Sequence, residues 1–264
     1  MSDSARRGPR AAARVISVSK GEGAMHINVE ELKRQAAEYA VAHFVTSGMV
    51  IGLGTGSTAR YAVEAIARRL QTGQLRDIVG IPTSRATART ALRLGIPLGT
   101  LNDHPVVEVT IDGADEVDPD MNLIKGRGGA LLWEKIVAAA SRQEVIIVDE
   151  TKRVARLGER APLPVEVIPC GWRSTFAFLE SLGAEPQLRV DPYDAGDAPY
   201  VTDEHHYILD CYFPNGIENP HELARTLKAR PGVVEHGLFL NLATHVVIAS
   251  THGIEVLGET SQVF

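Results

Sequence analysis

The segment Thr110–Lys135, TIDGADEVDPDMNLIKGRGGALLWEK, is the most informative part of the sequence. The apolar residues 106–111 predict a strand, and residues 130–141 predict a helix from their composition and their apolar side chains at helical spacing. An acidic stretch and a glycine-rich loop, residues 125–129, separate these two elements. In open α/β sheets the carboxyl ends of the strands form the edge at which ligands bind, so we expect a binding site here.

Polar side chains that suit proton-transfer chemistry gather in this segment. Asp112 and Asp115 stand where the predicted strand ends, and Lys125 opens the glycine-rich loop. Glu134 follows in the first turns of the predicted helix, where burial would raise the pKa of its carboxyl towards that of a general base. The loop before the helix supplies backbone N–H groups for an anion. Each residue alone has a plainer interpretation, as a turn aspartate or a solvated charge, but together they predict one reactive pocket.

A second glycine-rich loop, GLGTGST at residues 52–58, follows the predicted strand 49–53. Its third glycine, Gly56, comes one residue too early for the dinucleotide motif G-x-G-x-x-G, and no acid that could hold a ribose ends the next predicted strand, 78–81. Backbone N–H groups, hydroxyls and the dipole of the following helix favour a small phosphate instead. The alternative is a tight turn in which Ser57 only caps the helix.

Composition argues against several classes of protein. The 264 residues carry a formal net charge of −6, which disfavours nucleic acid as the main partner. The two cysteines, Cys170 and Cys211, form no C-x-x-C pair and no metal-ligand spacing, so we expect neither a zinc site nor a disulfide framework. No apolar stretch approaches the roughly 20 residues of a membrane helix. We therefore expect a cytoplasmic protein that uses no metal and no cofactor and binds no membrane.

Residues 1–24 differ in composition from the rest of the chain. Basic residues outnumber acidic ones there and no apolar period is present, so we expect a disordered extension. The segment lacks the apolar core of a secretory signal, while its arginine content is compatible with an organelle transit peptide. The plainer alternatives are a dispensable tail or an upstream start, with Met25 as the true initiator.

Short apolar runs alternate with helical patterns in the first part of the chain. This order is typical of an α/β fold with a Rossmann-like, doubly wound and mostly parallel sheet. The predicted helices are 29–45, 57–71, 85–94 and 130–141, and the predicted strands are 49–53, 78–81, 106–111 and 145–148.

The pattern changes after residue 161, where the predicted order becomes β-α-β-β-α-β, as in a ferredoxin-like α+β domain. The predicted strands are 165–168, 186–190, 206–213 and 233–239, and the predicted helices are 173–182 and 220–230. A last strand, 245–249, can return to the first sheet. We therefore expect a Rossmann-like catalytic domain of residues 25–158 and 240–264, with a ferredoxin-like domain of residues 159–239 inserted into it.

Taken in order along the chain, these motifs resemble ribose-5-phosphate isomerase, type A. The resemblance runs from about Leu32 to Ile254, and that family pairs a Rossmann-like sheet with a ferredoxin-like lobe, in agreement with the predicted elements. The motifs that carry it are GLGTGST (52–58), DGADE (112–116), KGxGG (125–129), EK (134–135), DxxK (149–152) and PVEVIP (164–169).

The resemblance implies the interconversion of D-ribose 5-phosphate and D-ribulose 5-phosphate, a step of the pentose phosphate pathway, without a metal. It implies that Glu134 is the base that carries a proton between C1 and C2, that Asp112 and Asp115 assist ring opening and hydroxyl proton movement, and that Lys125 stabilises the enediolate oxygen. One carboxylate can serve both directions of such a transfer. The resemblance also implies a homodimer or a dimer of dimers.

The same resemblance implies which residues contact the sugar phosphate. Arg127 and Trp133 stand where some relatives carry smaller residues, so both can tune the fit of the substrate. The implied contacts are Thr55, Gly56, Ser57, Thr58, Gly113, Ala114, Gly126, Arg127, Gly128, Lys152 and Lys33.

Two other classes of protein remain as alternatives. A nicotinamide-dependent oxidoreductase would need the dinucleotide motif and the ribose-binding acid that this sequence lacks. A sugar-phosphate sensor of a transcription regulator would share the phosphate loop but needs a DNA-binding module, and residues 25–48 offer one helix, too little for a helix-turn-helix. Such a sensor would also have no use for Glu134 as a proton carrier.

Overall fold

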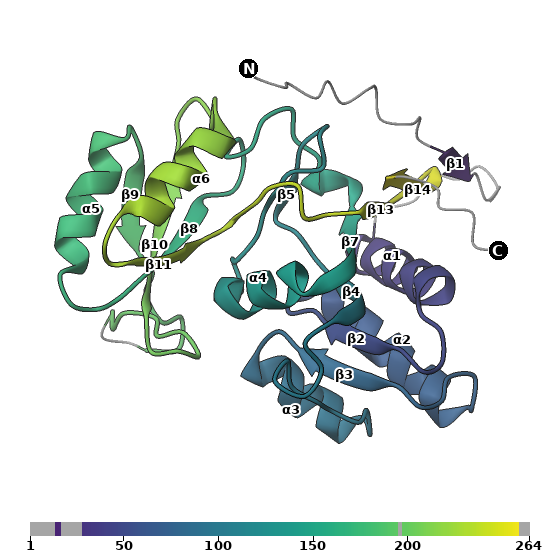
Figure 1. Ribbon diagram of the computed structural model, residues 1–264. Helices are drawn as coiled ribbons and strands as arrows, with labels where there is room; N and C mark the ends of the chain where they lie inside the picture. Colours follow the sequence, from purple (N-terminus) through teal and green to yellow (C-terminus); the bar gives the residue numbers. More distant parts are fainter. Residues whose placement is uncertain (1–13, 17–27, 195–196, 259–264) are drawn as a thin grey trace, which may run out of the picture.

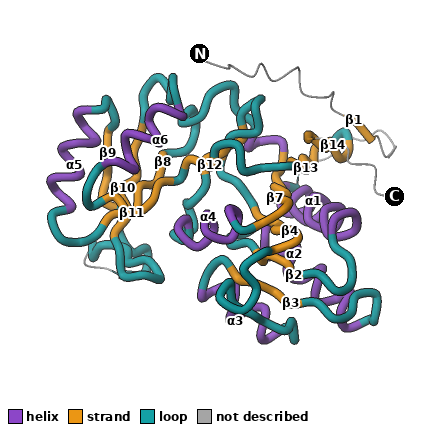
Figure 2. Tube along the Cα trace, viewed as in Figure 1, coloured by secondary structure: helices purple, strands orange, loops and turns teal. Residues whose placement is uncertain are grey.

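The computed structural model describes residues 14–16, 28–194 and 197–258, which fold into α-helices and β-sheets (Figures 1 and 2). The described strands belong to a seven-stranded, a four-stranded and a three-stranded sheet. None of the helices in these ranges is both long enough and apolar enough to cross a membrane.

The seven-stranded sheet has the strand order β1-β14-β13-β7-β4-β2-β3. The strands from β13 to β3 in this order are parallel, while β14 is antiparallel to both β13 and β1. The predicted mostly parallel sheet is therefore confirmed, with an antiparallel edge that the sequence did not indicate. The strands are β1 (Arg14–Ile16), β2 (Val50–Leu53), β3 (Val79–Pro82), β4 (Val107–Asp112), β7 (Ser141–Asp149), β13 (His245–Ser250) and β14 (Gly253–Gly258).

Helices cover both faces of this sheet, so its central strands bury apolar side chains on both sides. On β7, Val145 and Ile147 belong to the same core as the buried side chains of α1 and α2. Ile146 and Val148 point to the opposite face and share a core with Ala138 of α4. These helices are α1 (Val29–Phe44), α2 (Ala59–Gln71) and α4 (Leu131–Ala139), and α3 (Arg85–Arg93) lies against β3.

The four-stranded sheet has the order β11-β8-β10-β9, with every neighbouring pair antiparallel. Along the chain its elements follow the predicted β-α-β-β-α-β order, and this strand arrangement is the ferredoxin-like one. Figure 1 shows this sheet and its two helices beside the larger sheet. The elements are β8 (Leu163–Val167), α5 (Trp172–Ser181), β9 (Glu185–Leu188), β10 (Tyr207–Tyr212), α6 (Pro220–Ala229) and β11 (Val233–His236).

The prediction of one continuous strand over residues 233–239 is wrong. The segment divides into β11 and β12 (Leu238–Phe239), and β12 joins the three-stranded sheet with β6 (Leu123–Ile124) and β5 (Glu116–Val117). Gly237 lies at the division, and a Cβ there would meet the Lys125 carbonyl oxygen at 2.2 Å. The Lys125 N–H donates to the Gly237 carbonyl at 2.9 Å. The chain therefore changes sheets where its backbone presses against the backbone of Lys125.

Both ends of the described chain meet at the edge of the large sheet. Strand β13 returns there as predicted and pairs in parallel with β7. Within the extension expected to be disordered, residues 14–16 form β1 and pair with β14, so the expectation is wrong for these three residues. The other residues of that extension lie outside the described part of the chain.

Candidate active site

A pocket of about 390 Å³ opens at the carboxyl ends of β2 and β4. The structure brings nearly all the predicted site residues together here, although they come from distant parts of the sequence. Asp112 is the exception, because its side chain is 1% exposed and lies behind Lys125. The lining residues are Lys33, Thr55, Gly56, Ser57, Thr58, Gly113, Ala114, Asp115, Lys125, Gly126, Arg127, Gly128, Glu134 and Lys152.

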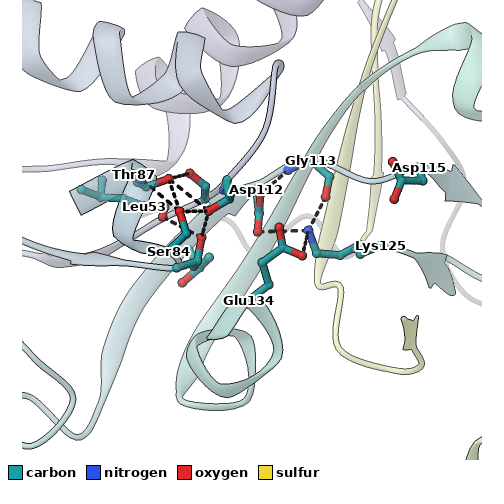
Figure 3. Close-up of polar contacts among 12 residues, drawn as sticks. Leu53, Ser84, Thr87, Asp112, Gly113, Asp115, Lys125 and Glu134 are labelled. Atoms are coloured by element: carbon teal, nitrogen blue, oxygen red, sulfur yellow. Dashed lines mark hydrogen bonds and ion pairs between the residues drawn. The ribbon is translucent and has the colours of Figure 1, made fainter. Parts of the chain in front are cut away.

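The floor of this pocket is formed by the buried ammonium of Lys125, which lies between the carboxyl groups of Asp112 and Glu134. The Nζ of Lys125 lies 3.0 Å from Oδ2 of Asp112 and 3.6 Å from Oε2 of Glu134, and it donates to the Gly113 carbonyl at 2.5 Å. Figure 3 shows the side chains of Asp112 and Glu134 converging on this nitrogen, with Asp115 set apart. All three charged side chains are at most 4% exposed, so their interactions are little screened by water.

Burial and the neighbouring charges shift the pKa values of Asp112, Lys125 and Glu134. Burial raises the pKa of Glu134 to about 8, and Lys125 only partly offsets it. Burial also raises the pKa of Asp112, against the Lys125 charge and two backbone N–H groups. Burial opposes the charge of Lys125, but the neighbouring carboxylates outweigh it and raise the pKa. Asp112 has donors in Lys125 and two backbone N–H groups, whereas Glu134 has only the ammonium, so the charged form is better supported at Asp112. Glu134, with its pKa raised to about 8, titrates near neutral pH.

The first glycine-rich loop passes directly against Asp112. The N–H groups of Thr55 and Gly113 donate to Oδ1 of Asp112 at 3.0 and 2.7 Å. A Cβ on Gly54 would meet the same oxygen at 2.3 Å, so only glycine allows this approach. The glycine spacing that resembled a nucleotide motif therefore serves to bring the loop onto a buried carboxylate.

The other end of the pocket presents donors suited to a phosphate. Thr58 is the N-cap residue of α2 and its side chain makes no capping hydrogen bond, so the turn is not capped by Ser57 as the alternative required. The Ser57 hydroxyl instead lies 3.2 Å from the Lys33 ammonium. Across the pocket, Asp149 caps the short 3₁₀ helix Glu150–Lys152 and so places Lys152 in the lining. The N-terminus of α2, with its positive dipole end and two cations beside it, forms a site for an anion.

The hydroxyl of Thr55 faces away from this anion site. It lies within 3.0 Å of the hydroxyls of Thr83, Ser84 and Thr87, and Thr87 also donates to the Gly54 carbonyl. Since its N–H is held by Asp112, both polar groups of Thr55 are engaged within the protein. This hydroxyl cluster holds the first glycine-rich loop on the side away from the pocket. Sequence reasoning missed it because its members lie far apart in the sequence, after β2 and at the start of α3.

Asp115 belongs to the opposite wall, beside the second glycine-rich loop. Its Oδ2 accepts from the Arg127 N–H at 3.0 Å, while its own N–H donates to the Ile124 carbonyl at 2.8 Å. The next residue, Glu116, is fully buried and accepts backbone hydrogen bonds from Gly158, Arg160 and Ala161 at 2.6 to 2.7 Å. Sequence reasoning missed this structural role of Glu116. Within the described residues, no group of three or more His, Cys, Asp or Glu side chains is arranged to hold a metal ion.

Comparison with known proteins identifies the family of this chain. The family model of ribose 5-phosphate isomerase A (phosphoriboisomerase A) matches residues 79–253, more than half of the chain. The chain belongs to this family. A ribose-5-phosphate isomerase A of Synechococcus sp. (strain JA-3-3Ab) is 53% identical over 234 residues, which cover 88% of this chain and 99% of that protein.

Solved structures of ribose-5-phosphate isomerases have the same fold. A D-ribose-5-phosphate isomerase in complex with phospho-erythronic acid superposes with a TM-score of 0.85 at 39% identity, over 88% of this chain and 100% of that one. The ribose 5-phosphate isomerase of Plasmodium falciparum gives a TM-score of 0.83 at 39% identity, over 88% and 99% of the two chains. The two-sheet architecture predicted from the sequence is therefore that of the ribose-5-phosphate isomerase A family.

This member of the isomerase family carries one more buried carboxyl close to the pocket. Glu144 of β7 is 1% exposed, and neither of its carboxylate oxygens has a hydrogen-bond partner among the described residues. Burial, reinforced by the charges of Asp112 and Glu134, raises its pKa well above the usual 4.5. Folding therefore favours the protonated form of Glu144, and its two carboxyl oxygens remain buried without hydrogen-bond partners, which destabilises the fold.

We expect Glu144→Met to stabilise the protein. Removing an unsatisfied buried group of this kind should raise the free energy of unfolding by about 1–3 kcal/mol at pH 7. The gain should grow as pH rises above 4.5, because the pKa of Glu144 is higher in the folded protein than in the unfolded chain, so ionisation favours the unfolded chain. Urea unfolding between pH 5 and 8 tests both effects. Glu144→Gln is the matched control, since it abolishes the pH-dependent part and keeps a buried polar group. A Glu144→Met protein no more stable than the wild type would contradict the expectation.

Proposed function

We propose that this chain interconverts D-ribose 5-phosphate and D-ribulose 5-phosphate by moving a proton between C1 and C2 through an enediolate, without a metal. The observation that carries the proposal is the buried Glu134 carboxyl, with a pKa of about 8, beside the Lys125 ammonium in a pocket whose other end is an anion site. Removing a proton next to a carbonyl needs a base on one side and stabilisation of the developing oxyanion on the other.

The phosphate group fits the end of the pocket formed by residues 55–58. There the N-terminus of α2 would receive the phosphate oxygens, with Ser57 and Thr58 as hydroxyl donors and Lys33 and Lys152 as cations. Thr55 contributes through its backbone position, since its hydroxyl and N–H are engaged elsewhere. Binding at this remote group would hold the sugar carbons beside Glu134, which converts part of the binding energy into orientation.

At the reacting carbons, Glu134 would remove the proton from one carbon and return it to the next. Lys125 would stabilise the enediolate oxygen, since its ammonium is already fixed before substrate binds. Asp112 is behind Lys125 and would act as a positioning residue through it. Asp115 lines the pocket and would move protons to and from the sugar hydroxyls, including the ring-opening step.

Phospho-erythronic acid, bound in a solved relative, helps to define this proposal. The molecule joins a phosphate to a planar carboxylate, and an enediolate would place its charge on a similar planar group. Compounds that resemble a charged intermediate bind more tightly than the substrate. We therefore expect this chain to bind phospho-erythronic acid with the phosphate at residues 55–58 and the carboxylate near Lys125.

Proton NMR of ribose 5-phosphate with the purified protein in D₂O and excess EDTA tests the proposal. The expected result is the appearance of ribulose 5-phosphate, with deuterium at the transferred position to the extent that the base exchanges with solvent. Heat-denatured protein serves as the control for spontaneous reaction. A folded protein that gives neither product nor deuterium uptake would overturn the isomerase assignment and favour a sugar-phosphate sensor.

The proposal includes a cytoplasmic location and assembly as a homodimer or a dimer of dimers. Cys170 and Cys211 are both free thiols, which supports a reducing compartment. Sedimentation of the purified chain would distinguish a monomer from these assemblies.

A further inference from the structure

The peptide groups of the second glycine-rich loop are held from outside the pocket. Arg189 follows β9, in the four-stranded sheet, and does not line the pocket. Its Nη1 donates to the Gly126 carbonyl at 3.1 Å and to the Arg127 carbonyl at 3.2 Å. One guanidinium therefore holds two successive peptide groups of the loop that begins with Lys125.

Arg189 is itself held rigidly. Its Nε and Nη2 donate to the two carboxylate oxygens of Asp210 on β10, at 2.8 and 2.5 Å. The two side chains are 13% and 17% exposed. A bidentate pair with little exposure fixes the plane of the guanidinium, which leaves Nη1 aimed at the loop.

The loop is also enclosed on this side by Tyr200. The Tyr200 N–H donates to the Arg189 carbonyl at 2.8 Å, so the two residues move together. A Cβ on Gly129, which has a φ of +80°, would meet the Tyr200 hydroxyl at 2.2 Å. The loop therefore lies between the pocket on one side and the segment of Arg189 and Tyr200 on the other.

Holding a carbonyl determines where the N–H of the same peptide group points. In a trans peptide the C=O and the N–H point in opposite directions. The Arg127 N–H accordingly points away from Arg189 and donates to Asp115. The Gly128 N–H shares a peptide group with the Arg127 carbonyl, so it also points away from Arg189, on the side where Gly128 lines the pocket. No group in the described part of the chain accepts a hydrogen bond from it.

We propose that Arg189 is a positioning residue for the isomerase reaction: it orients the Gly128 N–H to stabilise the enediolate oxygen and the Arg127 N–H to fix Asp115. The four-stranded sheet thereby contributes to the chemistry without touching the substrate. This inference rests on the proposed function, because the oxyanion that Gly128 would meet is the enediolate.

The test compares Arg189→Met and Arg189→Lys with the wild type and with Arg230→Met. Arg230 is the matched control, since it donates to Ser174 within the same ferredoxin-like arrangement and does not line the pocket. Turnover of ribose 5-phosphate gives kcat and KM, and calorimetry gives the affinities for phospho-erythronic acid and for inorganic phosphate. Thermal unfolding reports the integrity of each variant.

For Arg189→Met we expect kcat to fall by about tenfold or more, as one misplaced oxyanion donor costs up to about 10²–10³-fold. The affinity for phospho-erythronic acid should weaken by a similar factor, while that for inorganic phosphate changes by less than about twofold. Arg189→Lys should resemble Arg189→Met, because one ammonium cannot hold Asp210 and two carbonyls in the same geometry. Arg230→Met should keep the wild-type kcat and both affinities.

Each remaining outcome distinguishes the inference from the proposed function. A merely structural role would lower the thermal midpoint and the active fraction but leave the affinity for phospho-erythronic acid unchanged, and this would overturn the inference. So would an Arg189→Met enzyme with wild-type kcat. A wild-type protein that does not turn over ribose 5-phosphate would refute the proposed function instead, and the two calorimetric affinities would still show whether Arg189 orients the loop.

Discussion

Glu134→Gln is expected to lower kcat for ribose 5-phosphate by about 10²–10⁴-fold, the usual contribution of a positioned general base. The amide keeps the size of the side chain and removes the carboxyl whose pKa is raised to about 8. Because the pKa of Glu134 is raised in the folded state, its ionisation destabilises the fold as pH rises from 4.5 towards 8. The variant should therefore be at least as stable as the wild type at pH 8.

Steady-state kinetics together with calorimetry of inorganic phosphate would check this result. Phosphate affinity should stay within about twofold of the wild type, since the anion site lies at the other end of the pocket. Glu64→Gln, which changes an exposed glutamate of α2 that pairs with Arg60, is the control for the substitution itself. A Glu134→Gln enzyme with more than a tenth of wild-type kcat would show that another group removes the proton.

Lys125→Met should impair both turnover and stability. Removing the ammonium leaves Asp112 and Glu134 buried without their counter-charge, which typically costs about 3–5 kcal/mol. Loss of oxyanion stabilisation should lower kcat by a further factor of about 10²–10³. The pKa of Glu134 should also rise, because Lys125 is the charge that lowers it.

The pH dependence of kcat/KM separates these effects. In the wild type, kcat/KM should fall as pH drops below about 8, where Glu134 gains its proton and can no longer act as a base. In Lys125→Met the same fall should occur at higher pH, at a lower plateau. Lys228→Met changes an exposed lysine that pairs with the partly buried Glu235, away from the pocket lining, and should leave the profile unchanged. An unshifted profile in Lys125→Met would contradict the coupling of Lys125 to Glu134.

Sequence patterns predicted most of the fold because the strands of a parallel sheet that is buried on both faces contain recognisable apolar residues. The run 145–148 of β7 is apolar at every position, and β4 carries Val107, Val109 and Ile111 between polar residues. One glycine-rich loop follows β2 and the other follows β6. Asp112, Lys125 and Glu134 could be grouped because they lie within one strand-loop-helix unit. Their order in the sequence already places them at one sheet edge, and the structure brings them to one ammonium.

The residues that were missed depend on contacts between distant segments. Arg189 has no local pattern, and its contacts with the Gly126 carbonyl and with Asp210 need the second sheet to be in place. Gly237 divides the predicted strand 233–239 where the backbone of Lys125 approaches it. The predicted strand 145–148 excludes Glu144, whereas β7 begins at Ser141 and buries it. A charged residue normally marks an exposed position, so the sequence carries no sign of this burial.

The return of β13 to the large sheet means that this sheet cannot be completed until the four-stranded sheet has been synthesised. Strand β7 pairs with β4 on one edge and with β13 on the other, yet the whole four-stranded sheet is synthesised between β7 and β13. At about 5–20 residues per second, the nascent chain carries β7 with one open edge for several seconds. An open strand edge invites pairing with other chains, so protection of this edge during translation matters for the yield of active enzyme.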